Sequence, residues 1–165
     1  MTDVVRIDDD ATLLYAEAGI VISLPLTHPF TVDERSRWTH SAESGQLFIA
    51  EDARGVPVGF AAFEPADGQL YLDQLSVVRA AMKNGIGRAL LRRVVHEARS
   101  TGHDFLWLTT YSHLAWNRPF YEREGLVVVP ESECGSRIRH HIEDQRRFLP
   151  VPEERIAMKK DLRAP

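Results

Sequence analysis

Hydrophobic and polar positions follow two different periods along this chain. Apolar residues at every third or fourth position predict helices, and short alternating or β-branched runs predict strands. Helices are predicted at residues 8–23, 32–42, 86–101 and 117–124, with an amphipathic C-terminal helix through Ile138, Ile142 and Leu149. Strands are predicted at residues 4–7, 46–51, 56–64, 69–78, 105–111, 126–129 and 155–160.

Several predicted helix ends coincide with capping residues. Thr31 and Glu34 have the spacing of a capping box, in which each side chain satisfies a backbone N–H at the start of a helix. Gly45 and Gly102 can adopt the left-handed backbone that ends a helix. Asn117 can cap the short fourth helix.

The three strands in the middle of the chain are joined by short glycine-containing links at residues 52–55 and 65–68, which predicts an antiparallel meander. In the third of them the alternation of apolar residues slips by one position near Asp73 and Gln74. A β-bulge explains such a slip. A central strand buried on both faces is the alternative explanation.

Size and composition predict one domain covering residues 1–165. The chain has 165 residues, and its 44% hydrophobic content is enough for a core without disulfides. Its formal net charge of -4 argues against a basic face that would bind nucleic acid. The single cysteine, Cys134, and the acidic N-terminal residues indicate a cytoplasmic protein.

No membrane anchor is expected. The longest apolar stretch, residues 18–26, is interrupted by Ser23 and Pro25. It is much shorter than the roughly 20 residues that a membrane-spanning helix requires.

The segment Gly85–Arg88 lies between a predicted strand and a long helix. Glycines there let several backbone N–H groups and the positive end of the helix face a phosphate, although glycines before a helix are also common in simple turns. A Rossmann site would need a third glycine where Leu90 stands, and a Walker loop would need its lysine after the glycines, whereas Lys83 precedes them. The favoured interpretation is a pyrophosphate site of another kind.

Two longer segments carry a family resemblance. Leu75–Leu91 resembles motif A of the GNAT N-acetyltransferases, which binds the pyrophosphate of acetyl-CoA, and Trp116–Leu126 is similar to motif B of that family. Arg155–Met158 resembles the last strand of the family fold. The resemblance implies an α/β (α+β) fold with a mixed, mostly antiparallel sheet of about six to seven strands and helices on both faces.

The resemblance also implies which residues bind acetyl-CoA. The backbone of Leu75 and Val77 would bind the pantetheine arm and polarise the thioester carbonyl. The full set of expected contacts is Leu75, Val77, Lys83, Asn84, Gly85, Ile86, Gly87, Arg88, Asn117 and Tyr121. One position departs from the family, because Met82 stands where Gln or Arg is usual, so one side-chain contact is expected to be missing.

Acetyl transfer to an amine requires an acid for the leaving thiolate and a base for the amine proton. Tyr121 lies one helical turn after Asn117, and a phenol with a pKa of about 10 can donate a proton to a thiolate. The alternative is that Tyr121 belongs to an aromatic core stripe with Trp116 and Phe120.

The general base is left open by the sequence. Asp73 stands at the expected bulge, His113 follows a strand and has a suitable ordinary pKa, and Glu64 is a third candidate. A base that acts through water is an alternative.

The predicted reaction is transfer of an acetyl group from acetyl-CoA to a primary amine, on a small molecule, by direct attack through a tetrahedral intermediate. A protein N-terminus or lysine as acceptor, and a non-catalytic acyl-CoA-binding module, are the alternatives. No metal is expected, because the paired histidines His140 and His141 lack further ligands at metal-binding spacing. The acceptor is expected to be selected by residues 23–34 and 130–152, and a homodimer is one open oligomeric state.

Overall fold

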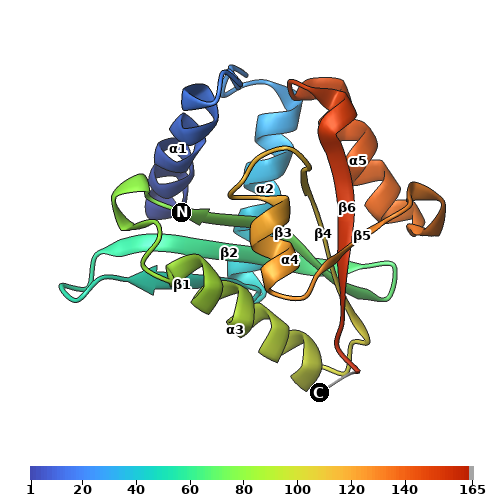
Figure 1. The fold of residues 1–165 in the computed structure, drawn as a ribbon. Coiled ribbons are helices and arrows are strands. Elements are labelled where there is room, and N and C mark those ends of the chain that lie inside the picture. The colour runs from blue at the N-terminus through green and yellow to red at the C-terminus, as the bar shows by residue number, and fades with distance from the viewer. Residues whose placement is uncertain (164–165) are drawn as a thin grey trace. The chain divides into compact units, whose positions relative to one another are not determined.

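The structure is a computed structural model that describes residues 1–163. Figure 1 shows its helices and strands in chain order. The helices are α1 (Thr2–Glu17), α2 (Pro29–Glu43), α3 (Ile86–Ser100), α4 (Arg118–Arg123) and α5 (Ser136–Phe148). The strands are β1 (Leu47–Glu51), β2 (Pro57–Ala66), β3 (Gln69–Val77), β4 (Phe105–Tyr111), β5 (Val127–Val129) and β6 (Arg155–Asp161). Three short 3-10 helices are η1 (Arg79–Ala81), η2 (Glu131–Glu133) and η3 (Pro152–Glu154).

Hydrogen bonds link the six strands in the order β1-β2-β3-β4-β6-β5. The β3–β4 pair is parallel, whereas β1–β2, β4–β6 and β5–β6 are antiparallel. The prediction of a mixed, mostly antiparallel sheet is therefore confirmed. By contacts between backbone positions the chain groups into two compact units, described separately below: unit 1 is residues 1–63 with 74–94, and unit 2 is residues 64–73 with 95–163.

The start of unit 1 differs from the sequence prediction. Residues 4–7 are not a strand but part of α1, so that prediction is wrong. Val4, Ile7 and Ala11 recur at helical spacing and are all buried. Val4 and Ile7 belong to a core with Trp38 and Phe60, whose rings meet edge to face at 5.4 Å. Burial of this helical stripe outweighs the weak β preference of a short valine-rich run.

Helix α2 is confirmed, but its cap is not the expected one. It begins at Pro29 instead of Val32, so Thr31 and Glu34 lie inside it. The cap is His28, whose Nδ1 accepts a hydrogen bond from the backbone N–H of Phe30 at 3.2 Å. Proline at the first helical position suits this start, because its missing N–H would have no partner there.

Gly59 on β2 allows close packing inside unit 1. A Cβ at this position would lie 3.1 Å from the carbonyl oxygen of Ser76 and 3.2 Å from side-chain atoms of Ile86 and Leu90. The strand backbone and the first turns of α3 therefore approach each other over a position without a side chain.

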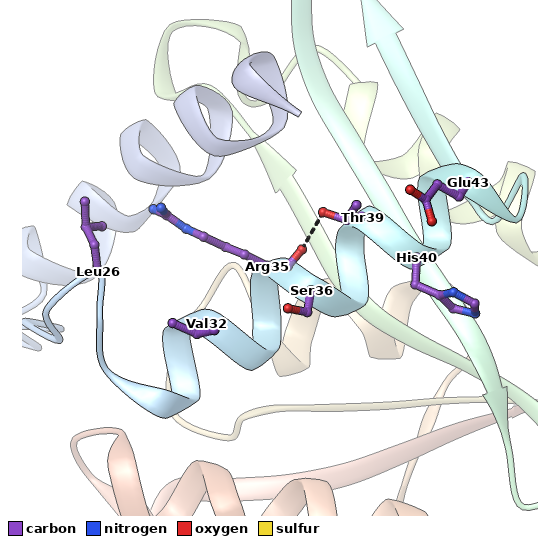
Figure 2. A pocket seen from close by; sticks show the side chains of 7 residues that line it. All are labelled: Leu26, Val32, Arg35, Ser36, Thr39, His40 and Glu43. Carbon is purple, nitrogen blue, oxygen red and sulfur yellow. Dashed lines mark hydrogen bonds between the residues drawn. The ribbon is translucent and has the colours of Figure 1, made fainter.

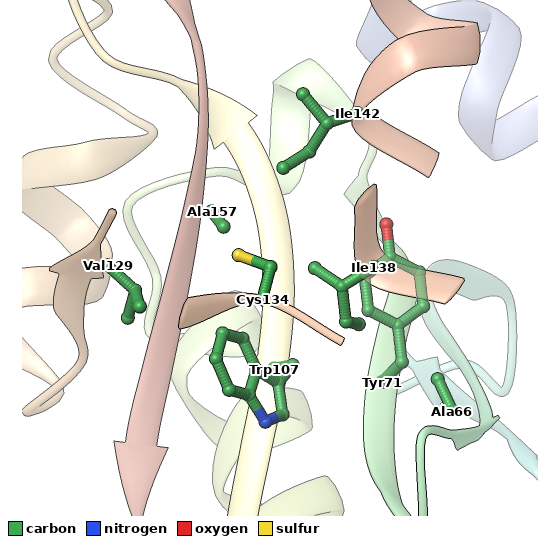
Figure 3. Close-up of a cluster of buried hydrophobic side chains, with 8 residues drawn as sticks. All are labelled: Ala66, Tyr71, Trp107, Val129, Cys134, Ile138, Ile142 and Ala157. Carbon is green, nitrogen blue, oxygen red and sulfur yellow. The ribbon is translucent and has the colours of Figure 1, made fainter. Parts of the chain in front are cut away.

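Unit 2 has its own apolar core, shown in Figure 3. Tyr71 and Trp107 are neighbours in the parallel β3–β4 register and contribute its largest side chains. The Tyr71 hydroxyl makes a 2.7 Å hydrogen bond with the hydroxyl of Thr109. The buried members of this cluster are Ala66, Tyr71, Trp107, Val129, Cys134, Ile138, Ile142 and Ala157.

Strand β3 is buried on both faces in its first half. Leu70, Tyr71 and Leu72 are consecutive and all nearly inaccessible, which fits the alternative of a central strand. Pairing with β4 covers these three residues and ends before Asp73. The β-bulge at Asp73 and Gln74 stays a prediction.

Helix α5 is capped by a side chain from the β2–β3 turn. The Asp67 carboxylate accepts hydrogen bonds from the backbone N–H groups of Arg137 at 3.1 Å and Ile138 at 3.2 Å, and from the Ser136 hydroxyl at 3.3 Å. Burial acts to raise the pKa of Asp67, but these hydrogen bonds hold it below its usual value. The N-cap residue of α5 itself is Gly135.

Replacing Gly135 by alanine should lower the free energy of unfolding by about 2–3 kcal/mol, because the new Cβ would overlap the Asp67 side chain and displace the cap. Urea unfolding measures this loss. The matched test is a double-mutant cycle with Asp67→Gly, in which Gly135→Ala should cost almost nothing once the Asp67 side chain is gone. Additive losses would show that the overlap is not the cause.

Candidate functional site

The predicted phosphate loop lies in unit 1 between η1 and α3. Lys83, Asn84 and Gly85 are exposed, and Gly85 has a φ of 83°, which requires glycine for an unstrained backbone. Lys83 also has a positive φ, of 64°, which is uncommon for a residue with a side chain. Such strained positions concentrate where a loop is shaped for a ligand.

The first turn of α3 presents backbone donors at this loop. The first hydrogen bond of the helix runs from the N–H of Ala89 to the carbonyl of Gly85 at 2.9 Å. The N–H groups of Ile86 and Gly87 precede it and therefore have no partner within the helix. Together with the positive end of the helix, these donors suit an anion such as a pyrophosphate.

The charges around the loop also suit a pyrophosphate. Lys83 and Arg88 are exposed and can add positive charge. The guanidinium of Arg79 binds Glu17 at 2.8 Å and Asp10 at 3.4 Å, and these contacts raise its pKa further. Met82 is half-buried and its apolar side chain cannot replace the polar contact that the family usually makes there.

Strand β3 leads into this loop and carries the two residues expected to bind the pantetheine arm. Leu75 is half-buried and Val77 is 8% exposed, so both side chains pack inward as ordinary apolar residues. Gln74 and Ser76 alternate with them, and both donate hydrogen bonds to the Asp8 carboxylate of α1, at 2.7 and 2.8 Å.

The motif B residues lie in unit 2. Asn117 is the N-cap of α4 and Tyr121 is one turn further along, with its N–H bonded to the carbonyl of Asn117 at 3.1 Å. Asn117 is 7% exposed and Tyr121 is 9% exposed, and the Tyr121 ring meets that of Phe120 edge to face at 5.0 Å. The expected side-chain cap by Asn117 is absent at this helix start.

The candidate bases occupy different surroundings. Asp73 is half-buried on β3. His113 follows β4 with its side chain 35% exposed, and its Nδ1 lies 3.6 Å from the carboxylate of Glu154. The ring of His113 meets Tyr111 edge to face at 5.7 Å. Their assignment as bases stays a prediction.

Glu64, the third candidate, is part of a charged cluster inside unit 2. Its Oε1 lies 3.2 Å from the guanidinium of Arg137 and 3.2 Å from Nε2 of His141. His141 stacks on Tyr71 with ring centroids 4.4 Å apart. Burial acts to raise the pKa of Glu64, but His141 and the charge of Arg137 lower it overall. A carboxylate stabilised in this way is a weaker base than an ordinary one.

One pocket lies along α2 in unit 1, with a volume of about 430 Å³. Figure 2 shows that its residues follow one side of the helix, with Leu26 on the preceding loop and Glu43 at the far end. The Arg35 carbonyl accepts a hydrogen bond from the Thr39 hydroxyl at 2.9 Å. Leu26 and Val32 belong to the segment expected to select the acceptor.

Within residues 1–163 no group of three or more His, Cys, Asp or Glu side chains is arranged to hold a metal ion. No helix among these residues has the length and apolar character needed to cross a membrane.

Residues 16–126, about two thirds of the chain, match the model of the acetyltransferase (GNAT) family. The chain belongs to this family. The match includes the loop at Gly85–Arg88 and the helix with Tyr121, and the predicted resemblance of the chain to the GNAT family is confirmed.

Solved structures share the GNAT fold. N-acetylglutamate synthase from Neisseria gonorrhoeae, in complex with coenzyme A and N-acetyl-glutamate, is 20% identical with a TM-score of 0.68 over 98% of this chain and 33% of that one. A GNAT-family acetyltransferase from Staphylococcus aureus Mu50 is 16% identical, with a TM-score of 0.68 over 94% and 90% of the two chains. PaiA N-acetyltransferase from Thermoplasma acidophilum, in complex with coenzyme A, is 13% identical, with a TM-score of 0.64 over 97% and 91%.

These likenesses concern the fold alone. This GNAT chain spans only a third of the length of the Neisseria enzyme, so the synthase contains much more than the shared domain.

Proposed function

We propose that this protein is an acetyl-CoA-dependent N-acetyltransferase that transfers an acetyl group to the primary amine of a small molecule. The observation that carries the proposal is the loop before α3, where the N–H groups of Ile86 and Gly87, which precede the first hydrogen bond of the helix, follow the left-handed residues Lys83 and Gly85. A loop of this form is suited to the pyrophosphate of coenzyme A, and family membership supports the same ligand.

Each part of the reaction then has a candidate group. The backbone of Leu75 and Val77 would hold the pantetheine arm and polarise the thioester carbonyl. The amine nitrogen attacks that carbonyl, a tetrahedral intermediate forms, and the C–S bond breaks. Tyr121 would protonate the departing thiolate of coenzyme A.

A small acceptor is supported by two observations. The pocket along α2 has a volume of about 430 Å³, which is the size of an ordinary small-molecule site. The Neisseria enzyme with the same fold was solved with N-acetyl-glutamate, a small acetylated amine. The net charge of -4 favours a cationic acceptor.

We place the reaction in the cytoplasm, because a chain with one cysteine cannot form an internal disulfide.

The test is calorimetric titration with acetyl-CoA and with coenzyme A, followed by measurement of thiol release. The acceptors would be a panel of primary amines: an amino acid, a diamine, a polyamine, an aminoglycoside and a short peptide with a free N-terminus. Binding together with amine-dependent thiol release is the expected result. Binding without turnover on any amine would favour a non-catalytic acyl-CoA-binding module, and no binding would overturn the proposal.

A further inference from the structure

Asp8 is held in a defined orientation against strand β3. Its Oδ1 accepts hydrogen bonds from Nε2 of Gln74 at 2.7 Å and from the hydroxyl of Ser76 at 2.8 Å. Nε2 of Gln74 also lies 3.0 Å from the Ser76 hydroxyl, so the three side chains form one connected group. Two donors on one oxygen fix the carboxylate and leave its other oxygen, Oδ2, with no hydrogen bond to any residue between 1 and 163.

The Asp8 carboxylate contacts strand β3 next to the residues expected to bind the thioester. Gln74 and Ser76 flank Leu75, and Ser76 is followed directly by Val77. Leu75 and Val77 are the residues whose backbone is expected to hold the reacting thioester. Asp8 therefore contacts the two residues that flank Leu75 on strand β3.

If Asp8 only attached α1 to the rest of unit 1, it would duplicate contacts that other residues of the helix already make. The same helix is already attached by Asp10, which accepts a hydrogen bond from the backbone N–H of Arg79 at 2.6 Å, and by Glu17, which binds the Arg79 side chain at 2.8 Å. Asp8 adds a half-buried charge on the inner side of the helix, and its burial costs stability that the hydrogen bonds from Gln74 and Ser76 offset only in part.

We propose that Asp8 is the general base that accepts the proton of the acceptor amine; this inference rests on the proposed function. The ammonium group of the acceptor gives its proton to Oδ2 of Asp8, and the freed nitrogen lone pair forms the C–N bond to the acetyl carbonyl. The C–S bond breaks, and its electron pair leaves with the coenzyme A thiolate, which takes a proton from the general acid. The nitrogen, cationic after the attack, gives its second proton to the deprotonated general acid, so that the product is a neutral amide.

The electrostatics agree with this role. Burial raises the pKa of Asp8 to about 6, against the lowering effect of the hydrogen bonds from Ser76 and Gln74. The charged groups facing it are Asp9 on the same helix, which raises the pKa, and Arg35 on α2, which lowers it. Asp8 is therefore mostly ionised at pH 7 and is a stronger base than an ordinary carboxylate.

The decisive variant is Asp8→Asn, because the asparagine oxygen can still accept both hydrogen bonds but cannot take a proton. With the fastest acceptor of the amine panel, kcat should fall roughly 100-fold while the Kd for acetyl-CoA stays within about twofold. The parent protein should lose activity as the pH falls through about 6, since Asp8 then becomes protonated. This acidic limb should be absent from the variant.

Stability separates this role from a structural one. A raised pKa means that the ionised carboxylate disfavours the folded state above pH 6, so Asp8→Asn should have an equal or higher Tm than the parent at pH 8. A lower Tm in the variant, or weaker acetyl-CoA binding, would show that Asp8 is a tether and would overturn the inference. Unchanged kcat and an unchanged acidic limb would also overturn it.

The control is Asp3→Asn on the same helix, where the carboxylate is exposed and binds Arg6 at 3.2 Å. Its rate and pH profile should match those of the parent. Failure of the proposed function would be visible earlier, in the parent protein, as no acetyl-CoA binding or no turnover on any amine. In that case the assignment of Asp8 as the general base is overturned together with the proposed function.

Discussion

Replacing Gly87 by tryptophan should weaken acetyl-CoA binding at least 100-fold, or by about 2.7 kcal/mol. Gly87 lies in the first turn of α3, where its own N–H and that of Ile86 precede the first hydrogen bond of the helix. A phosphate oxygen must come within about 3 Å of such donors to bind them. An indole attached at this turn would block that approach. Titration calorimetry with acetyl-CoA and with coenzyme A measures the loss.

The matched control places the same side chain further along the same helix. His96 is exposed on α3, well beyond its first turn, so His96→Trp should leave the Kd for acetyl-CoA within about twofold. Circular dichroism should confirm that both variants are folded. Parent-like affinity in a folded Gly87→Trp protein would contradict binding of the pyrophosphate at this loop.

Most of the sheet could be predicted because its strands are defined by local signals. Strand β4 has the predicted bounds, Phe105–Tyr111, and the meander β1–β2–β3 follows from short glycine-containing links. The strand predicted at residues 4–7 fails because Val4 and Ile7 fit both a β-branched run and a helical stripe. Their packing with Trp38 and Phe60 decides the outcome, and these partners are distant in the sequence.

The candidate site was predictable to the same extent. The loop at Gly85 and the Asn117–Tyr121 turn are continuous segments, so their spacing is visible in the sequence. Asp8 was missed because its partners Gln74 and Ser76 are 66 and 68 residues away. Before folding it is one of three consecutive aspartates that could all cap a helix, and only packing against β3 distinguishes it.

The cluster around Glu64 was missed for the same reason. Arg137 and His141 lie in a segment rich in basic residues, yet His141 is 8% exposed and stacks on Tyr71. Glu64 lies 73 residues before Arg137. The lowered pKa of Glu64 argues for an ion-pairing role in unit 2 and against proton transfer.

Replacing Tyr121 by phenylalanine should lower kcat by roughly 100-fold or more and leave the Kd for acetyl-CoA nearly unchanged. The substitution removes only the phenol oxygen, so the buried ring can keep its edge-to-face contact with Phe120. Without a proton donor the thiolate must leave as an anion or take its proton from water. Steady-state thiol release with the fastest amine of the panel measures the effect, and calorimetry measures the affinity.

The control for this prediction removes another buried phenol oxygen. Tyr71→Phe loses the 2.7 Å hydrogen bond with Thr109, which should cost about 1 kcal/mol of stability and change kcat by less than about threefold. The two variants therefore separate loss of a buried hydroxyl from loss of an acid. An unchanged kcat in Tyr121→Phe would show that Tyr121 is a packing residue of the aromatic core and not the general acid. Equal losses of kcat in both variants would point to a general effect on folding, since Tyr71 is not among the residues proposed to act in the reaction.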